Sequence, residues 1–262
     1  MKLTGRAVSA GVAEGLVLAS HQPMSFLGGV DRESGVVTDG TSDLRGEAVA
    51  GKALVFPHGK GSTVGSYVLF GLAKRGRGPA AIVNERTEAI VATGAILGEI
   101  PLVDGIDVSL LRTGDRAIVD GRAGAVEVPG VVERPVVTAF LRNRGRVLVV
   151  KRSERVGTFR GMWSGISGYL EGRESPVRRA RQELREETGI TGAHLRARGP
   201  VIRTRGDAVI FAIHPFLFDV SARRVRLDWE NVEARWVAPK EIAKLPTVPR
   251  LADALASVLA GR

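Results

Sequence analysis

Three glutamates spaced about one helical turn apart constrain this 262-residue sequence more than any other feature. Glu183, Glu186 and Glu187 lie in residues 175–188, a segment that predicts a helix ending at Gly189. At 3.6 residues per turn, positions i, i+3 and i+4 share one face, so the three carboxylates converge. Since like charges repel unless they are neutralised, this face favours a divalent cation. Mg²⁺ prefers carboxylate and phosphate oxygens, so the sequence predicts a magnesium site on this helix.

A longer pattern surrounds these acids: Gly168, five residues, Glu174, seven residues, and then Gln182-Glu-Leu-Arg-Glu-Glu-Thr-Gly-Ile190. This pattern resembles the Nudix box, except that Gln182 stands where the family has arginine. The resemblance implies a Nudix α/β/α sandwich that cleaves a diphosphate linked to another group. The box glycines, Gly168 and Gly189, would support the loop–helix–loop.

The Nudix resemblance also implies a role for each acid. Glu183 and Glu187 would be the principal ligands of Mg²⁺ or Mn²⁺. Glu186 would be a further ligand or the base that activates water, with Glu174 in support. The family arginine usually holds a glutamate through a salt bridge, whereas Gln182 offers a hydrogen bond without charge.

The alternative interpretation of this helix is a solvated face rich in glutamate and arginine. That interpretation accommodates Arg178, Arg179 and Arg181 but leaves the terminal glycines unexplained. Under the Nudix interpretation, Arg179 lies one turn before Glu183 and is a candidate to replace the missing box arginine.

A glycine-rich loop marks the first half of the chain. Gly59, Lys60 and Gly61 follow an apolar strand expected at Ala53–Phe56 and precede a helix expected over residues 63–74. Glycines let the backbone approach a ligand closely, a helix N-terminus favours an anion, and Lys60 adds positive charge. The spacing is not that of a Walker loop. The alternative is that Ser62 only caps the helix.

More of the first half carries a second resemblance. The matching runs, in chain order, are residues 25–31, 35–39, 51–57, 59–69, 79–83 and 95–103. Together they resemble the small subunit of aconitase X-type hydro-lyases, whose archaeal members are phosphomevalonate dehydratases. The resemblance implies an aconitase-like swivelling β/β/α domain.

This second resemblance implies a reaction and a partner. The family converts (R)-5-phosphomevalonate to trans-anhydromevalonate 5-phosphate in a mevalonate route to isoprenoids. Ser62 would be the base that removes a proton, with Gly59, Lys60 and Gly61 binding substrate. A [4Fe-4S] cluster on a separate large subunit would bind and expel the hydroxyl, so we expect a heterodimer.

The two resemblances divide the chain at residues 127–135, a segment with two prolines and one glycine. We expect an α/β swivelling domain at residues 1–130 and an α+β Nudix domain at residues 131–262. The first part holds 13 basic and 14 acidic side chains and the second holds 25 and 14. The basic half could attract nucleic acid or small phosphorylated substrates, and compositional drift is the alternative explanation, since 31 of the 38 basic residues are Arg. The alternative function for this half is a catalytically weak module that binds a nucleotide or nucleic acid and regulates the dehydratase.

The sequence contains no cysteine, which excludes disulfides and any cysteine-held metal or cluster within this chain. We expect a cytoplasmic protein with no membrane segment. Trp229 and Trp236 are expected to pack in the second core. Further strands are expected at residues 80–83, 117–119, 125–128, 136–141, 147–151 and 208–220, and helices at residues 88–94, 239–244 and 251–259.

Overall fold

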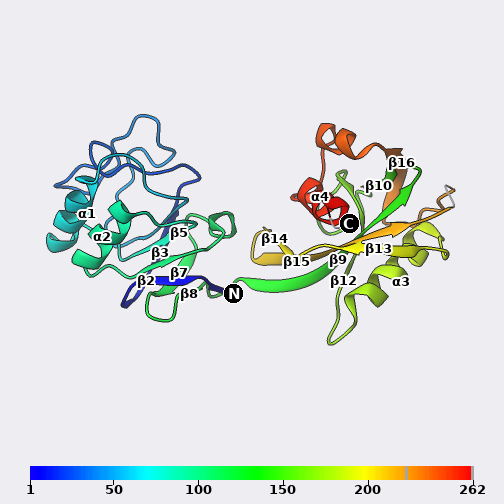
Figure 1. Cartoon of the computed structure of the whole chain (residues 1–262), viewed down its shortest axis with the longest axis horizontal. Coiled ribbons are helices and arrows are strands. Elements are labelled where there is room, and N and C mark those ends of the chain that lie inside the picture. Colours follow the sequence, from blue (N-terminus) through cyan, green and yellow to red (C-terminus); the bar gives the residue numbers. More distant parts are fainter. Residues whose placement is uncertain (222–223, 261–262) are drawn as a thin grey trace. The chain divides into compact units, whose positions relative to one another are not determined.

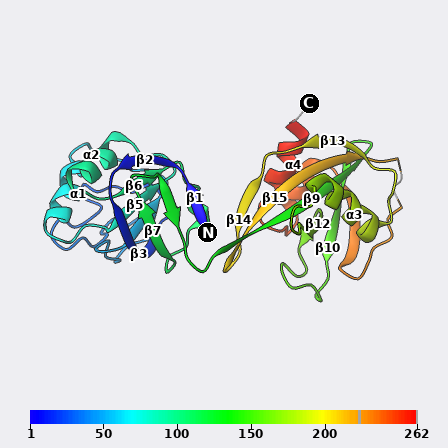
Figure 2. The same ribbon diagram turned by 90° about the horizontal axis from the view of Figure 1, so that it is seen from below.

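The chain forms two compact units, Met1–Val132 and Glu133–Arg262. The structure is a computed structural model that describes residues 1–221 and 224–260. Each unit has a sheet and a hydrophobic core of its own (Figures 1 and 2). Among the described residues, no helix combines the length and apolar character needed to cross a membrane.

The first unit is built on an eight-stranded mixed sheet in the order β1-β8-β7-β3-β4-β5-β6-β2. Its strands are β1 Lys2–Thr4, β2 Arg6–Ser9, β3 Val12–Ala19, β4 Ala53–Phe56, β5 Ala81–Asn84, β6 Leu102–Asp104, β7 Arg116–Asp120 and β8 Ala125–Glu127. Neighbours from β3 to β6 are parallel, and the outer strands pair antiparallel. The central strands β4 and β5 are buried throughout, as parallel strands covered on both faces require.

Helices connect the parallel strands of this unit. Helix α1, Gly65–Lys74, follows β4; α2, Ala89–Leu97, follows β5; and a 3₁₀ helix, η1, covers Val108–Leu110. Helix α1 begins two residues later than the sequence predicts, and α2 extends three residues further. The Glu88 carboxylate caps α2 by accepting a hydrogen bond from the Val91 amide. The connections place the glycine-rich loop between the C-terminal end of β4 and the start of α1.

The second unit contains another eight-stranded sheet. Its main path is β11-β10-β9-β15-β13, with β12 on β9, β14 on β15 and β16 on β10. The strands are β9 Val132–Asn143, β10 Arg146–Arg152, β11 Trp163–Ser164, β12 Ile166–Tyr169, β13 His194–Arg198, β14 Ile202–Arg205, β15 Val209–Asp219 and β16 Asn231–Val237. The β9–β10 turn uses positive φ at Arg144 (45°) and Gly145 (76°), as a two-residue hairpin requires.

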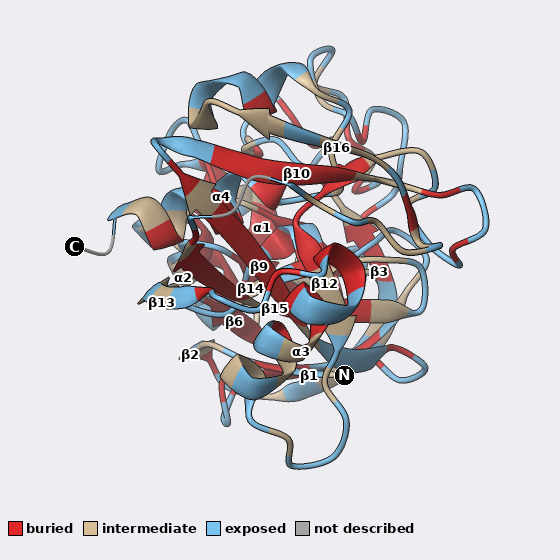
Figure 3. Cartoon of the chain, turned by 90° about the vertical axis from the view of Figure 1, so that its right-hand side faces the viewer, coloured by how far each residue is buried: buried red, intermediate tan, exposed pale blue. Residues whose placement is uncertain are grey.

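Two helices cover opposite faces of this second sheet. Helix α3, Pro176–Thr188, packs on one face and α4, Leu251–Ala260, on the other (Figure 1). Alternate residues of β9 and β10 contribute to the two cores, so residues 137–141 of β9 and 147–150 of β10 are buried (Figure 3). The expected helix at Pro239–Lys244 is a 3₁₀ helix, η2.

The two tryptophans expected in the second core differ. Trp236 packs against the core on the α3 side. Trp229 is 58% exposed, so that expectation is wrong for this residue. It precedes β16 in a polar segment, Asp228 to Asn231, whose acidic and amide groups face the carboxylates of α3. Trp229 is therefore an exposed fluorophore, whereas Trp236 is half-buried.

Candidate functional site

Helix α3 presents its three glutamates unequally. It begins after Ser175 with Pro176 in the first turn and ends at Gly189, whose φ of 70° is left-handed. Glu183 and Glu187 are 6% and 4% exposed, whereas Glu186 is exposed. The amphipathic face of α3 therefore directs two of the three carboxylates inward.

Burial raises the pKa of both inward carboxyls. The pKa of Glu183 rises to about 7, mainly because of burial and partly because of the Glu186 charge, against the opposing effect of Arg179. The pKa of Glu187 rises to about 8, again mainly through burial, although a hydrogen bond from Asn231 favours its charged form. Desolvated carboxylates that repel one another would gain from a nearby cation.

Each carboxylate of α3 has a protein partner. Glu183 forms a salt bridge with Arg179, one turn earlier. Glu187 accepts hydrogen bonds from Asn231 Nδ2 at 2.6 Å and from the Ser167 amide at 3.2 Å. Glu186 Oε1 accepts one from Gln182 Nε2 at 2.9 Å.

Two glycines and one further acid complete the predicted set. A Cβ at Gly168 would lie 1.9 Å from Glu183 Oε1, so a glycine there lets β12 approach the buried carboxylate. Gly189 ends the helix with a left-handed φ. Glu174 is half-buried just before the helix, and its amide donates to the Glu171 carbonyl.

A cavity of about 250 Å³ lies beside the carboxylates of α3 within the second unit. Glu183, Glu186 and Arg179 from α3 line it, together with Arg152 and Glu230. The rest of the lining comes from Val136, Thr138, Thr158, Phe159, Ser164, Ser167, Gly168, Tyr169, Thr204, Phe211, Ile213, Val248 and Pro249. The cavity thus joins a charged wall to a largely apolar one, which is typical of a small-molecule site.

The glycine-rich loop of the first unit is anchored at its beginning. The Gly59 amide donates to Glu88 Oε2 at 2.8 Å, and the Lys60 amide donates to the Met24 carbonyl at 2.8 Å. A Cβ at Gly59 would lie 2.2 Å from Glu88 Oε1, so only glycine lets the loop approach this carboxylate. These contacts hold Gly59 and Lys60, the part of the loop nearest to β4, in place.

The second half of the loop is exposed and carries Ser62. Its hydroxyl accepts a weak hydrogen bond from the Val64 amide at 3.3 Å, while the residue at the helix cap position is Val64. Ser62 is therefore not the N-cap residue. In the described part of the chain, the amides of Gly61, Ser62 and Thr63 have no hydrogen-bond partner. Three consecutive free N–H groups before a helix form a place for an anion.

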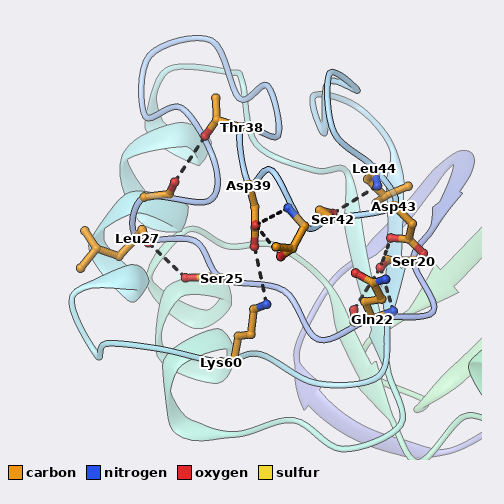
Figure 4. A network of polar contacts seen from close by, with 12 residues as sticks. Ser20, Gln22, Ser25, Leu27, Thr38, Asp39, Ser42, Asp43, Leu44 and Lys60 are labelled. Atoms are coloured by element: carbon orange, nitrogen blue, oxygen red, sulfur yellow. Dashed lines mark hydrogen bonds and ion pairs between the residues drawn. The ribbon is translucent and has the colours of Figure 1, made fainter.

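Lys60 points away from the helix axis toward a neighbouring loop. Its Nζ lies 3.5 Å from Asp39 Oδ2, and Asp39 also accepts hydrogen bonds from the amide and hydroxyl of Thr41 (Figure 4). These bonds and the Lys60 charge hold the pKa of Asp39 below its usual range. Ser25 lies against the loop on the same side, with its Oγ 3.1 Å from the position of a Cβ at Gly61.

Comparison with known proteins assigns both units. Residues 2–128 match the family of the aconitase X swivel domain, and residues 132–258 match the NUDIX domain family. The phosphomevalonate dehydratase small subunit of Thermococcus kodakarensis is 58% identical over 128 residues, which cover 49% of this chain and 96% of that relative. The chain joins an aconitase X swivel domain to a Nudix domain. The relative matches the swivel domain alone.

Two solved structures are similar to the two domains. The crystal structure of Thermococcus kodakaraensis aconitase X (holo-form) is 57% identical, covering 49% of this chain and 98% of that one, with a TM-score of 0.48. The MutT protein of Methanosarcina mazei is 27% identical, covering 48% of this chain and 92% of that one, with a TM-score of 0.43.

The Nudix domain contributes site residues that the box pattern does not contain. Asn231 is the first residue of β16 and Glu230 directly precedes it, at least 40 positions after the box. Burial and the Asp228 charge raise the pKa of Glu230. The only feature of the sequence that could have indicated Glu230 and Asn231 is the run Asp228-Trp-Glu-Asn231 in front of a strand. This run does not indicate that Asn231 would contact Glu187.

The Nudix carboxylates have suitable chemistry for Mg²⁺ but are turned toward protein groups. Among residues 1–221 and 224–260, no three His, Asp or Glu side chains are grouped so that they could hold a metal ion. Glu183 and Glu187 nevertheless supply buried carboxylate oxygens, the type of ligand that a hard cation prefers. Ion binding would therefore require Glu183 to turn from Arg179.

Proposed function

We propose that the swivel domain is the small subunit of a heterodimeric hydro-lyase that dehydrates (R)-5-phosphomevalonate to trans-anhydromevalonate 5-phosphate. The observation that carries this proposal is 58% identity over 96% of a phosphomevalonate dehydratase small subunit. The exposed serine loop supports it, because a residue that acts on substrate held by another subunit must lie at the surface.

Ser62 is the base in this proposal. A serine hydroxyl is a weak base unless its alkoxide is stabilised, and the Val64 amide, which donates to the Ser62 hydroxyl at 3.3 Å, is a donor that could stabilise it. Lys60 would bind the substrate phosphate after leaving Asp39. The large subunit would hold the [4Fe-4S] cluster, which supplies the Lewis acid for the hydroxyl, since this chain has no cysteine.

The test is anaerobic co-expression of the full chain with a candidate large subunit, followed by a dehydration assay. Ser62→Ala should co-purify normally with its partner and lose at least 100-fold in kcat, as expected for a missing base. Ser109→Ala, whose hydroxyl donates to Asp107 Oδ1, is the matched control. Unchanged dehydration in Ser62→Ala would refute the role of Ser62, and failure to assemble with any large subunit would refute the proposal itself.

We further propose that the Nudix domain is a Mg²⁺-dependent diphosphate hydrolase. The observation that carries this proposal is the pair of buried carboxylates, Glu183 and Glu187, of which Glu183 lines a cavity together with Glu186. Glu183 and Glu187 would hold the metal, with Glu186 as a further ligand or as the base that deprotonates water. When bound, Mg²⁺ or Mn²⁺ would neutralise phosphate charge and acidify the attacking water.

The Nudix proposal is tested by phosphate or pyrophosphate release from a panel of diphosphates with Mg²⁺ or with EDTA. Glu187→Gln should abolish release, whereas Glu233→Gln, at a half-exposed acid of β16 that is not in the cavity lining, should not change it. The excess of basic side chains in this half, 25 against 14 acidic ones, favours a second candidate, a binding module that regulates the dehydratase. No turnover together with salt-sensitive RNA or DNA binding would support that candidate.

A further inference from the structure

The glycine-rich loop of the first unit is held at both ends by the N-terminus of helix α2. At the beginning of the loop, the Gly59 amide donates to Glu88 Oε2 at 2.8 Å. After the end of the loop, a Cβ at Gly65, the first residue of α1, would lie 3.2 Å from Ile90 Cγ2. Because Glu88 is the N-cap of α2 and Ile90 lies two residues later, one short piece of α2 sets where the loop starts and where it ends.

The Glu88 carboxylate bonds two backbone amides at once. Its Oε2 holds Gly59, and its Oε1 accepts from the Val91 amide at 3.2 Å as the cap of α2. A cap alone does not require glutamate, since aspartate, asparagine and serine are the residues preferred at this position. The longer side chain of glutamate lets the same carboxylate reach the loop as well.

Lys60 is held by contacts that do not involve Glu88. Its amide donates to the Met24 carbonyl at 2.8 Å, and its Nζ lies 3.5 Å from Asp39 Oδ2 (Figure 4). The Ser62 hydroxyl, by contrast, accepts a single hydrogen bond of 3.3 Å from a backbone amide in the part of the chain that the structure describes. The position of Ser62 therefore depends on where the two ends of the loop are held.

We infer that Glu88 is a positioning residue for Ser62, which it places through the Gly59 amide. The inference rests on the proposed dehydratase function, in which Ser62 is the base, and it adds to that function a residue outside the loop. Glu88 occupies the Gly59 amide, so Gly59 shapes the loop instead of binding substrate with its own N–H group. The contact is worth testing because a displacement of about 1 Å in a reacting group can cost on the order of 100-fold in rate.

The substitution Glu88→Asp separates the two contacts of this carboxylate. The shorter side chain can cap α2 but cannot reach the loop as well, so the helix should be kept and the loop released. Amide hydrogen exchange of the full chain, measured by NMR, reports both contacts without any enzymatic activity. In Glu88→Asp the Gly59 amide should exchange at least tenfold faster, because a hydrogen bond to a charged group is lost, and the Val91 amide less than threefold faster.

The same variant is then assayed as the full chain in complex with a large subunit. Glu88→Asp should lower kcat for dehydration at least tenfold and change KM less than threefold, because Lys60 keeps its own contacts while Ser62 is displaced. Glu241→Asp is the matched control, since Glu241 Oε2 also accepts from a backbone amide, that of Ala238, in the other domain. This control should leave kcat and KM unchanged.

Glu88→Gln is a second variant in case Glu88→Asp folds poorly, because glutamine keeps the length but offers one acceptor oxygen to two amides. Across the wild type and both variants, kcat should follow the protection of the Gly59 amide and not that of the Val91 amide. Faster exchange at Gly59 with unchanged kcat, a loss confined to KM, or wild-type exchange at Gly59 in Glu88→Asp would overturn the inference.

Failure of the proposed function gives a different result. Absence of dehydration by the wild-type complex would refute the dehydratase proposal and with it the role of Ser62. The exchange rates of the Gly59 and Val91 amides would still decide whether Glu88 holds the loop.

Discussion

Removing the Arg179 guanidinium should destabilise the Nudix domain, because it leaves the Glu183 carboxylate buried beside other acids. Arg179 is the cation paired with Glu183. Burial raises the pKa of Glu183, and the negative charges of Glu186 and Glu230 raise it further. We expect Arg179→Met to keep most of the packing of the arginine stem while removing the charge. The change therefore isolates the electrostatic role of this residue.

The structure sets the size of the effect. Breaking a fully buried ion pair costs about 3–5 kcal/mol, and an exposed pair contributes about 0–1 kcal/mol. Glu183 is buried but the Arg179 side chain is 24% exposed, so we expect a loss of about 2 kcal/mol at pH 8. The exposed pair Arg235–Glu233, 2.6 Å apart, is the reference and should contribute under about 0.5 kcal/mol.

The assay is urea unfolding followed by tryptophan fluorescence. All three tryptophans, Trp163, Trp229 and Trp236, belong to the Nudix domain, so the signal reports this domain within the full chain. A double-mutant cycle of Arg179→Met with Glu183→Gln gives the coupling between the two side chains. The measurement is made in EDTA to exclude stabilisation by bound cations.

The coupling should also depend on pH. The folded-state pKa of Glu183, about 7, lies above its ordinary value of 4.5, so ionisation of this group lowers stability as pH rises through that window. The pair with Arg179 exists only when Glu183 is ionised, so the coupling should be largest at pH 8 and small at pH 5.5. A coupling below 0.5 kcal/mol at pH 8, or one that does not fall at pH 5.5, would refute this reasoning.

Three further substitutions test other parts of the chain. Gly59→Ala should destabilise the swivel domain by about 1–2 kcal/mol in calorimetry, because its Cβ would lie 2.2 Å from Glu88 Oε1 and displace the capping carboxylate. Asp104→Asn should cost about 1–3 kcal/mol at pH 7, since Arg6 pairs with both carboxylate oxygens. Arg6 holds the pKa of Asp104 below its usual range, so this contribution is present above about pH 3.8 and lost as pH falls through the folded-state pKa. Gln182→Arg should change the rate of diphosphate release less than threefold; a tenfold increase would show that the missing box arginine limits catalysis.

Local patterns allowed much of the fold to be predicted. Helix α3 is amphipathic, has Pro176 at its start and ends at a left-handed Gly189, so its bounds follow from short-range rules. The β9–β10 turn is indicated by Gly145, which readily adopts one of the two positive φ values that such a turn requires, whereas the positive φ of Arg144 is uncommon for its residue type. The start of α1 was less predictable, since Ser62 resembles a cap but Val64 occupies that position.

The parts of the site that depend on long-range packing could not be predicted. Asn231 reaches Glu187 only because β16 pairs with β10, and no local pattern specifies that pairing. Ser164 is a second example: its hydroxyl is buried and has no hydrogen-bond partner among the described residues, and this depends on how the strands of the sheet are assembled. The sequence predicts Trp229 in the core because its side chain is large and apolar. Composition does not specify which side chains of a loop face solvent, and Trp229 is one that does.

The substitution at position 182 illustrates why a motif should be interpreted through contacts. Helical geometry lets residue 182 reach residue 186 and residue 179 reach residue 183, since each pair is four positions apart. The glutamine therefore removes charge beside Glu186, which is exposed and gains little from an ion pair. Glu183 is buried and needs a cation far more, and Arg179 supplies it. The departure from the Nudix pattern thus falls on the carboxylate that tolerates it best.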